Sequence, residues 1–155
     1  MSDRSERGPS GPAGGQERTE REQLPAAAPQ VNLETQDFWD ATAEGRFLLK
    51  RCDTCGVVIW YPRFLCPACH GTETSWFEAS GRGTIYTFTV VRRGQGPYAD
   101  AAPYVAAYVE LEEGPRVLTN IVDCDPEQVT IGQQVEVVWH DTGEGSALYR
   151  FKPVG

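Results

Sequence analysis

The sequence lacks any long apolar run, and its first 37 residues contain none of the 16 aromatic side chains of the 155-residue chain. A membrane helix needs about 18 consecutive apolar residues, and no stretch approaches that length. No apolar segment of the signal-peptide kind lies near the first residue, so we expect a cytoplasmic location. These absences argue against membrane insertion and export. They leave a folding unit of about 120 residues, which is one domain or two small ones.

Positive charge is also in short supply, with 14 Lys and Arg residues against 22 Asp and Glu residues and a formal net charge of −8. From Glu78 onward, 11 acidic and 6 basic residues give −5. Such a negative field repels phosphate backbones and anionic lipids at long range. The charge therefore disfavours nucleic acid and membrane surfaces as partners, while leaving room for a local basic site.

Histidine is nearly absent, and the sequence offers no set of residues typical of catalysis. The chain has 2 His residues, of which His140 precedes Asp141 in a strand-like segment. Neighbouring strand residues point to opposite faces, so these two make a poor acid–base pair. Cys124 stands alone in an apolar segment, which is typical of a small buried residue. We therefore expect no catalytic residue on this chain.

Residues 1–33 are predicted to form a disordered tail. The first 30 residues contain four Gly, four Pro and charges of both signs. A segment of this composition cannot bury enough apolar surface to offset the entropy lost on ordering. We interpret it as a spacer.

Four cysteines within 18 residues are the most specific pattern in the chain. Two C-x2-C pairs, separated by ten residues, are formed by Cys52, Cys55, Cys66 and Cys69. A C-x2-C turn aims two thiolates at one point, and two such knuckles complete a tetrahedral shell that suits Zn²⁺. Because four sulfurs leave no open coordination position, we expect the zinc to be structural.

Other interpretations of these cysteines can be weighed against zinc. A disulfide framework belongs to exported proteins, and a redox C-x-x-C occurs once rather than twice in a hairpin. Iron in a rubredoxin-like site uses the same four ligands, so the spacing alone leaves iron open. His70, next to Cys69, could replace a sulfur ligand, although an exposed histidine after a complete knuckle fits the pattern better.

A short helix is predicted over residues 35–45, ahead of the cysteines. Thr35 can cap its start and Gly45 can end it. Phe38 and Trp39 must dock against the ribbon or against a partner protein, because two adjacent large aromatics cannot stay in water. Strands at 46–51 and 57–61 then form the zinc hairpin. Its surplus of aromatics predicts a partner-binding surface, to which we assign Phe38, Trp39, Trp60, Tyr61 and Phe64.

In the remainder of the chain, apolar and polar residues alternate as they do in β-strands. Five segments rich in β-branched and aromatic residues are separated by turns, and they begin near residues 84, 105, 117, 135 and 147. This pattern predicts a five-stranded Greek-key barrel of the OB type. The fold class is therefore mainly β: helix and ribbon over residues 34–76, and barrel over residues 77–155.

One connection of the predicted barrel is long and chemically suggestive. Residues 92–103 join its first two strands, where OB barrels carry a binding loop. Arg suits phosphate recognition and Tyr offers a stacking face, so Arg92, Arg93 and Tyr98 are the candidate ligand-binding residues of this loop. A purely solvated loop is the alternative.

The chain resembles a known family, the acyl-CoA-associated OB-fold proteins with an N-terminal rubredoxin-like zinc ribbon. The resemblance covers about residues 35–153. It rests on Phe38 and Trp39, residues 51–56 (Arg-Cys-Asp-Thr-Cys-Gly), Pro62 and Arg63, residues 66–69 (Cys-Pro-Ala-Cys), Trp76, residues 80–88 beginning Ser-Gly-Arg-Gly, and Ile131 with Gly132. His70 departs from the family pattern, in which glycine commonly follows the second knuckle.

The resemblance implies a non-catalytic accessory subunit. Members of the family accompany thiolase-like and lipid-transfer-type proteins, and some work with hotdog-fold enoyl-CoA hydratases. Such complexes process acyl-CoA, including an aldolase step in steroid side-chain degradation and thiolase reactions, with the catalytic residues on the partner. With acyl-CoA as the ligand of the complex, Arg92, Arg93 and Tyr98 become candidates to contact the phosphate or adenine of CoA. Two other hypotheses stay open, a nucleic-acid-binding zinc-ribbon/OB module and a rubredoxin-like electron carrier.

Overall fold

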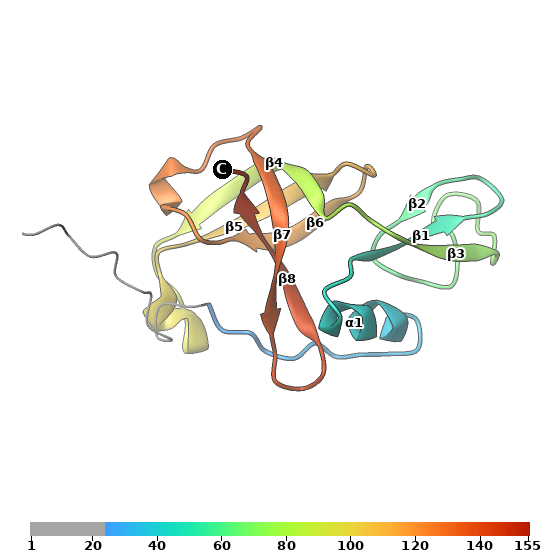
Figure 1. The fold of residues 1–155 in the computed structure, drawn as a ribbon, viewed down its shortest axis with the longest axis horizontal. Coiled ribbons are helices and arrows are strands. Elements are labelled where there is room, and N and C mark those ends of the chain that lie inside the picture. The colour runs from blue at the N-terminus through green and yellow to red at the C-terminus, as the bar shows by residue number, and fades with distance from the viewer. Residues whose placement is uncertain (1–23) are drawn as a thin grey trace, which may run out of the picture.

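A computed structural model describes residues 24–155 as one helix, a small ribbon sheet and a closed barrel (Figure 1). Helix α1 spans Gln36–Ala43, and no described helix has the length and apolar character needed to cross a bilayer. The ribbon strands are β1 (Leu48–Cys52), β2 (Val58–Ile59) and β3 (Thr74–Glu78). The barrel strands are β4 (Arg82–Val91), β5 (Tyr104–Leu111), β6 (Arg116–Ile121), β7 (Gln134–Asp141) and β8 (Ala147–Pro153).

Helix α1 begins and ends at the predicted residues, but the capping hydrogen bond predicted for Thr35 is not formed. Thr35 occupies the cap position but its side chain bonds back to Asn32 and makes no bond to the first turn. At the other end, Gly45 has a φ of 71° and its amide donates to the carbonyl of Thr42. The amide of Arg46 reaches Ala41, which completes the bond pair of a Schellman motif.

The ribbon is a three-stranded sheet with the order β2-β1-β3. The predicted hairpin of β1 and β2 is present, with Lys50 opposite Ile59. Strand β3 was not predicted as part of this sheet, yet it pairs with all five residues of β1, placing Trp76 opposite Lys50. It follows directly on the second knuckle, so the chain returns alongside β1 and closes the ribbon.

The prediction of a five-stranded barrel is confirmed. The strands close in the order β4-β5-β6-β8-β7, and the exchange of the last two strands distinguishes this Greek-key arrangement from a simple meander. The motif at residues 80–83 explains how the barrel begins. Gly81 has a φ of 73°, and a Cβ on Gly83 would lie 2.6 Å from the backbone oxygen of Glu110 on β5. Glycine at these two positions allows the chain to bend and β4 to pair closely with β5.

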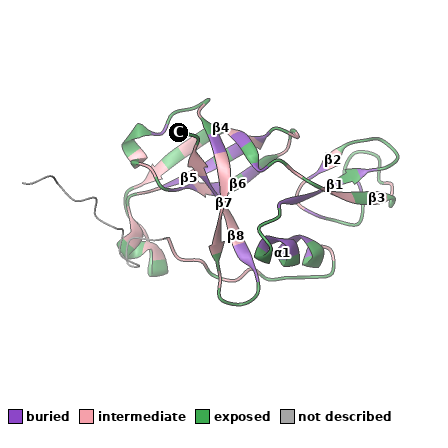
Figure 2. Ribbon diagram, in the orientation of Figure 1, coloured by how far each residue is buried: buried purple, intermediate pink, exposed green. Residues whose placement is uncertain are grey.

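One hydrophobic core joins the helix, the ribbon and the barrel. At its centre, the ring of Phe38 lies 4.9 Å from that of Trp39, 5.7 Å from Phe47 and 5.3 Å from Trp60, all edge-to-face. Tyr149 of β8 joins this cluster from the barrel, with its ring 5.4 Å from that of Phe47. Figure 2 shows the buried positions of α1 on the side that faces the other elements.

This cluster corrects the assignment of Phe38 and Trp39 to a partner-binding surface. Phe38 is 0% exposed and Trp39 is 6% exposed within the chain itself. The indole nitrogen of Trp39 donates a hydrogen bond to the hydroxyl of Tyr61 at 2.6 Å. The two aromatics dock on the ribbon and on the barrel together, because the helix lies in the angle between them.

The predicted tail extends too far toward the helix. Residues 1–23 lie outside the described residues, but residues 24–33 have a defined course along the barrel to α1 (Figure 1). The backbone oxygen of Leu24 accepts a hydrogen bond of 2.9 Å from the buried Arg150. Composition favoured disorder here, and tertiary hydrogen bonds from Arg150 to the backbone oxygens of Leu24 and Pro25 oppose it.

Candidate functional site

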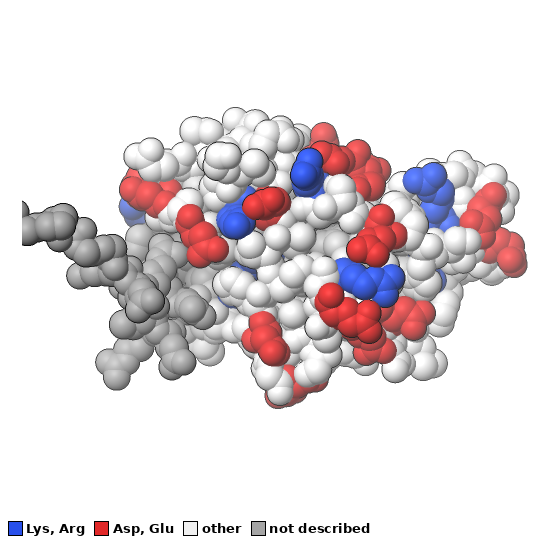
Figure 3. Space-filling view, in the orientation of Figure 1, with Lys and Arg blue, Asp and Glu red and all other residues white. Residues whose placement is uncertain are grey.

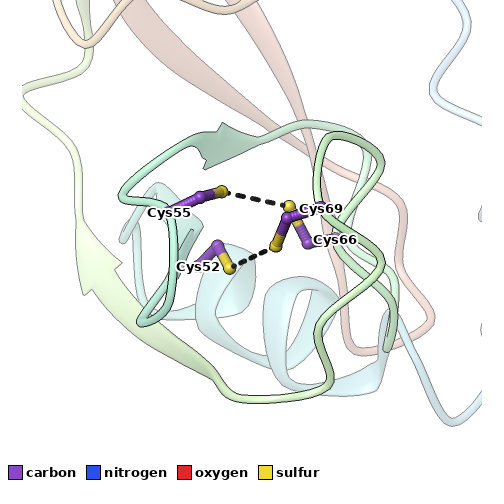
Figure 4. A group of neighbouring side chains, drawn as sticks. All are labelled: Cys52, Cys55, Cys66 and Cys69. Atoms are coloured by element: carbon purple, nitrogen blue, oxygen red, sulfur yellow. Dashed lines mark hydrogen bonds between the residues drawn. The ribbon is translucent and has the colours of Figure 1, made fainter.

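The four predicted metal ligands meet at one point between the two knuckles (Figure 4). Their sulfur atoms all lie within 4.8 Å of one another. The Sγ atoms of Cys52 and Cys69 are 3.5 Å apart, and those of Cys55 and Cys66 are 3.6 Å apart. With Zn–S bonds of about 2.3 Å, a tetrahedral shell has sulfur–sulfur edges of about 3.8 Å. The sulfurs are therefore already near the spacing that zinc requires.

The two knuckles are built alike by their backbones. The amide of Gly56 donates to the carbonyl of Cys52, and the amide of His70 donates to that of Cys66, each at 2.9 Å. Both donor residues have positive φ, 77° for Gly56 and 61° for His70. His70 thus occupies the position where the first knuckle has glycine. It is exposed and lies outside the sulfur cluster, which consists of the four cysteines.

Backbone amides prepare the sulfurs for a cation. The pKa of Cys52 is lowered to about 6, chiefly because the amide of Cys55 donates to its sulfur. The amide of Cys69 likewise lowers the pKa of Cys66. For Cys55 the amide of Val57 acts in the same direction, but local desolvation of the sulfur and the neighbouring thiols outweigh it and raise the pKa to about 12. A dication bound by all four sulfurs would replace their remaining protons.

These features fit a closed structural zinc site. All four donors are sulfurs, two of them are buried, and none of the four coordination positions remains for water or substrate. The zinc would fix the two knuckles to each other in a unit whose own hydrophobic core is small.

The candidate cofactor-binding residues do not gather at one place. Arg92 forms an ion pair of 2.8 Å with Glu127, and both side chains are largely exposed. Arg93 is exposed as well. The ring of Tyr98, in the short 3₁₀ helix η2 (Gly96–Ala101), instead packs 5.4 Å from the ring of Tyr104 and lies near the buried Arg150. Tyr98 therefore faces inward, whereas the two arginines face solvent.

The other residues assigned to a partner surface differ among themselves. Trp60 and Tyr61 are half-buried in the aromatic cluster, whereas Phe64 is 53% exposed. The ammonium of Lys50 lies 5.6 Å from the ring of Phe64 and 4.8 Å from that of Trp76. Lys50 thereby holds the loop that carries Phe64 against strand β3.

An exposed apolar corner, which sequence analysis missed, surrounds Phe64. It consists of Val31, Leu33, Phe64 and Leu65, which are 49%, 83%, 53% and 52% exposed. The amide of Phe64 donates to the carboxylate of Glu34 at 2.8 Å, so the two contributing segments lie side by side. A groove of about 630 Å³ runs between them and is lined in part by Leu65, Arg63 and His70. Only the folding of residues 31–34 beside the ribbon creates this surface.

Charge on the barrel is mixed rather than concentrated. On the face drawn in Figure 3, acidic and basic side chains are interspersed, and the described ion pairs join exposed partners such as Arg116 and Glu110. Together with the net charge of −8, this pattern gives a nucleic-acid backbone little to bind.

A three-stranded ribbon carrying four cysteines, followed by a five-stranded Greek-key barrel, defines a zinc-ribbon OB-fold protein. Comparison with known proteins agrees with this class. Residues 39–75 match the model of the ChsH2 rubredoxin-like zinc ribbon domain, and residues 76–140 match that of the ChsH2 C-terminal OB-fold domain. A DUF35 domain-containing scaffold protein of Methanocaldococcus jannaschii is 43% identical over 67% of this chain and 79% of its own. The chain belongs to this DUF35/ChsH2 family.

Two further relatives have names that mention CoA, and one solved structure is named as an aldolase. A probable enoyl-CoA hydratase alpha subunit of Thermomonospora curvata is 33% identical over 85% of this chain and 42% of its own. A benzoylsuccinyl-CoA thiolase subunit of Geobacter metallireducens is 35% identical over 53% of this chain and 59% of its own. A chain of the Ltp2–ChsH2(DUF35) aldolase superposes with a TM-score of 0.74 and 31% identity, over 81% of this chain and 98% of that one.

Proposed function

We propose that this chain is a cytoplasmic, non-catalytic zinc-binding subunit that pairs with a thiolase-like protein to process acyl-CoA. The observation that carries the proposal is the likeness to the aldolase chain, which spans 98% of that chain and includes ribbon and barrel alike. A relative named as a thiolase subunit supports the same class of partner. We assign to the complex an acyl-CoA aldolase or thiolase reaction on lipid or steroid side chains.

The apolar corner is the surface we assign to the partner. Val31, Leu33, Phe64 and Leu65 expose large apolar side chains on two segments that the bond between Glu34 and Phe64 holds together, and exposed apolar surface of this kind usually marks a contact site. The corner stands on the ribbon, which zinc would make rigid, so the partner would meet a preformed surface.

Co-expression with thiolase-like proteins from the same genome tests the proposal. We expect one of them and this chain to co-elute from a size-exclusion column, and acyl-CoA turnover to require both. The double variant Phe64→Asp, Leu65→Asp should weaken the complex at least about tenfold, since charges would enter a dry contact. Leu118→Asp is the matched control, because Leu118 is 56% exposed on the barrel.

The outcomes separate the parts of the proposal. Full turnover by this chain alone, or failure to associate with any thiolase-like protein, would contradict the proposed function. A complex that survives the double variant but is lost in Leu118→Asp would move the interface from the apolar corner to the barrel. A hotdog-fold enoyl-CoA hydratase that co-elutes in the same experiment would add a second partner, as a relative named as a hydratase subunit suggests.

We also infer that Arg92 and Arg93 contact a phosphate of the bound acyl-CoA at the edge of the complex. Both side chains are solvent-exposed at the start of the long barrel loop, and only Arg92 shares its charge with an acid, Glu127. The double variant Arg92→Ala, Arg93→Ala should raise the acyl-CoA dissociation constant of the complex at least about tenfold, since a single charged hydrogen bond contributes about 1.5–3 kcal/mol and about 1.4 kcal/mol corresponds to a factor of ten. Calorimetric titration that gives an unchanged constant would overturn this inference.

A further inference from the structure

Arg150 of strand β8 is a buried charge with an unusual set of partners. Its side chain is 2% exposed, and it donates to the backbone oxygens of Leu24, at 2.9 Å, and of Pro25. It also donates to Nδ1 of His140 at 2.7 Å. Among the ion pairs of residues 24–155, none includes Arg150. A buried guanidinium without a carboxylate depends on every one of its neutral acceptors.

Two of these acceptors belong to a segment that covers the end of the barrel. Residues 24–26, here called the strap, lie at the start of the blue stretch that continues past β7 and β8 to α1 (Figure 1). Leu24 and Ala26 form one wall of a pocket of about 510 Å³, opposite Tyr104, Val122 and Trp139 of the barrel. Removal of the strap would therefore open this pocket on one side.

The bond between Arg150 and His140 determines the protonation state of the histidine ring. Arginine is always a donor, so Nδ1 of His140 must carry a lone pair and the ring must be neutral. Protonation would place a second donor and a second positive charge 2.7 Å from the guanidinium. The charged groups facing His140 are Arg150, which opposes protonation, and Asp123, which favours it; Asp141 lies beside it on the pocket rim.

We propose that Arg150 and neutral His140 form a latch that holds the strap over the barrel pocket, and that protonation of His140 releases it. When His140 becomes cationic, Arg150 loses one acceptor and is repelled, and its hold on the Leu24 and Pro25 oxygens weakens with it. This inference does not depend on the proposed function.

The direction of the pH effect follows from linkage. Burial, and after it the charge of Arg150, lowers the pKa of His140 below its ordinary value of 6.5. The latched state consequently binds fewer protons than the released state, so proton uptake favours release. The latch is closed at pH 7.5 and weakens as the pH falls below about 6.5.

Nitrogen-15 NMR relaxation on the full zinc-loaded chain tests the latch. The amides of Leu24, Ala26 and Ala27 report on the strap, and the ring signals of His140 report on its protonation. We expect order parameters near about 0.85 at pH 7.5, falling below about 0.6 as His140 titrates. The variant His140→Gln should keep the strap rigid at both ends of this range, because an amide oxygen accepts from Arg150 without titrating.

The chain offers a matched control, since it contains only one other histidine. The variant His70→Asn suits the left-handed position of His70 and should behave like the wild type. A strap that stays rigid in the wild type once the ring signals show that His140 is protonated, or that loosens equally in His140→Gln, would overturn the proposal. Arg150→Gln should loosen the strap at every pH, and a strap that remains rigid there would overturn it as well.

Discussion

At the residue scale, the spacing of the cysteines was enough to predict the metal ligands. The C-x2-C pairs predicted the ligand set, and the structure brings all four sulfurs within 4.8 Å of one another. Spacing sufficed because each knuckle is a local turn whose geometry is set by a few backbone bonds, such as that from Gly56 to Cys52. The residues next to Arg150 in the chain gave no sign that it would be buried. Its hydrogen-bond partners are Leu24, Pro25 and His140.

Loss of one exposed cysteine should release the metal and unfold the ribbon. Cys55 is exposed, so the change Cys55→Ser tests ligation rather than packing. Structural zinc binding in small domains is coupled to folding and contributes about 10–16 kcal/mol of apparent free energy. We expect the zinc content to fall from one equivalent toward zero, and Tm to drop by more than about 10 °C.

Elemental analysis and thermal unfolding measure both effects. The matched control is Cys124→Ser, which lies outside the sulfur cluster and should leave the zinc content unchanged. Retention of one tightly bound zinc in Cys55→Ser would contradict the four-sulfur site. Iron in place of zinc, seen in the same measurement, would instead support an electron carrier.

At the element scale, patterning predicted the strands and the helix well but said less about their neighbours. The alternation of apolar and polar residues predicted the five barrel strands, and Gly45 predicted the end of α1. Strand β3 was missed as a ribbon strand because its residues look like the start of the barrel pattern. The aromatics of α1 were assigned to a partner because a helix with two large apolar residues does not itself reveal what it packs against.

Truncation of the central aromatic of α1 should destabilise the whole fold. Phe38 is 0% exposed and contacts ring systems of both the ribbon and the barrel. The change Phe38→Ala leaves a large cavity and should lower the free energy of unfolding by about 3–5 kcal/mol. Urea unfolding followed by tryptophan fluorescence measures it.

Phe64→Ala is the companion variant, because Phe64 is 53% exposed and makes only a distant cation–π contact with Lys50. It should cost no more than about 1 kcal/mol. If the two variants were equally destabilising, the shared core around α1 would not be the main link between ribbon and barrel.

At the scale of the whole molecule, ribbon and barrel behave as one packed body. Each is small, and the joint aromatic cluster around Phe38, Phe47 and Tyr149 supplies core that neither would have alone. This arrangement leaves the apolar corner and the strap on separate parts of the surface, one beside the knuckles and one at the end of the barrel. A partner at the corner and a pH response at the strap can therefore act independently.

The sequence by itself determined the metal ligands, the order of helix, ribbon and barrel, and the acidic charge, because these depend on local turns, on side-chain periodicity and on composition. Tertiary structure alone decided that Phe38 and Trp39 are core, that Phe64 belongs to an exposed corner with Leu33, and that Arg150 holds the strap. These outcomes depend on which distant segments come together. Burial and charge pairing between them have no signal in the neighbouring residues of the chain.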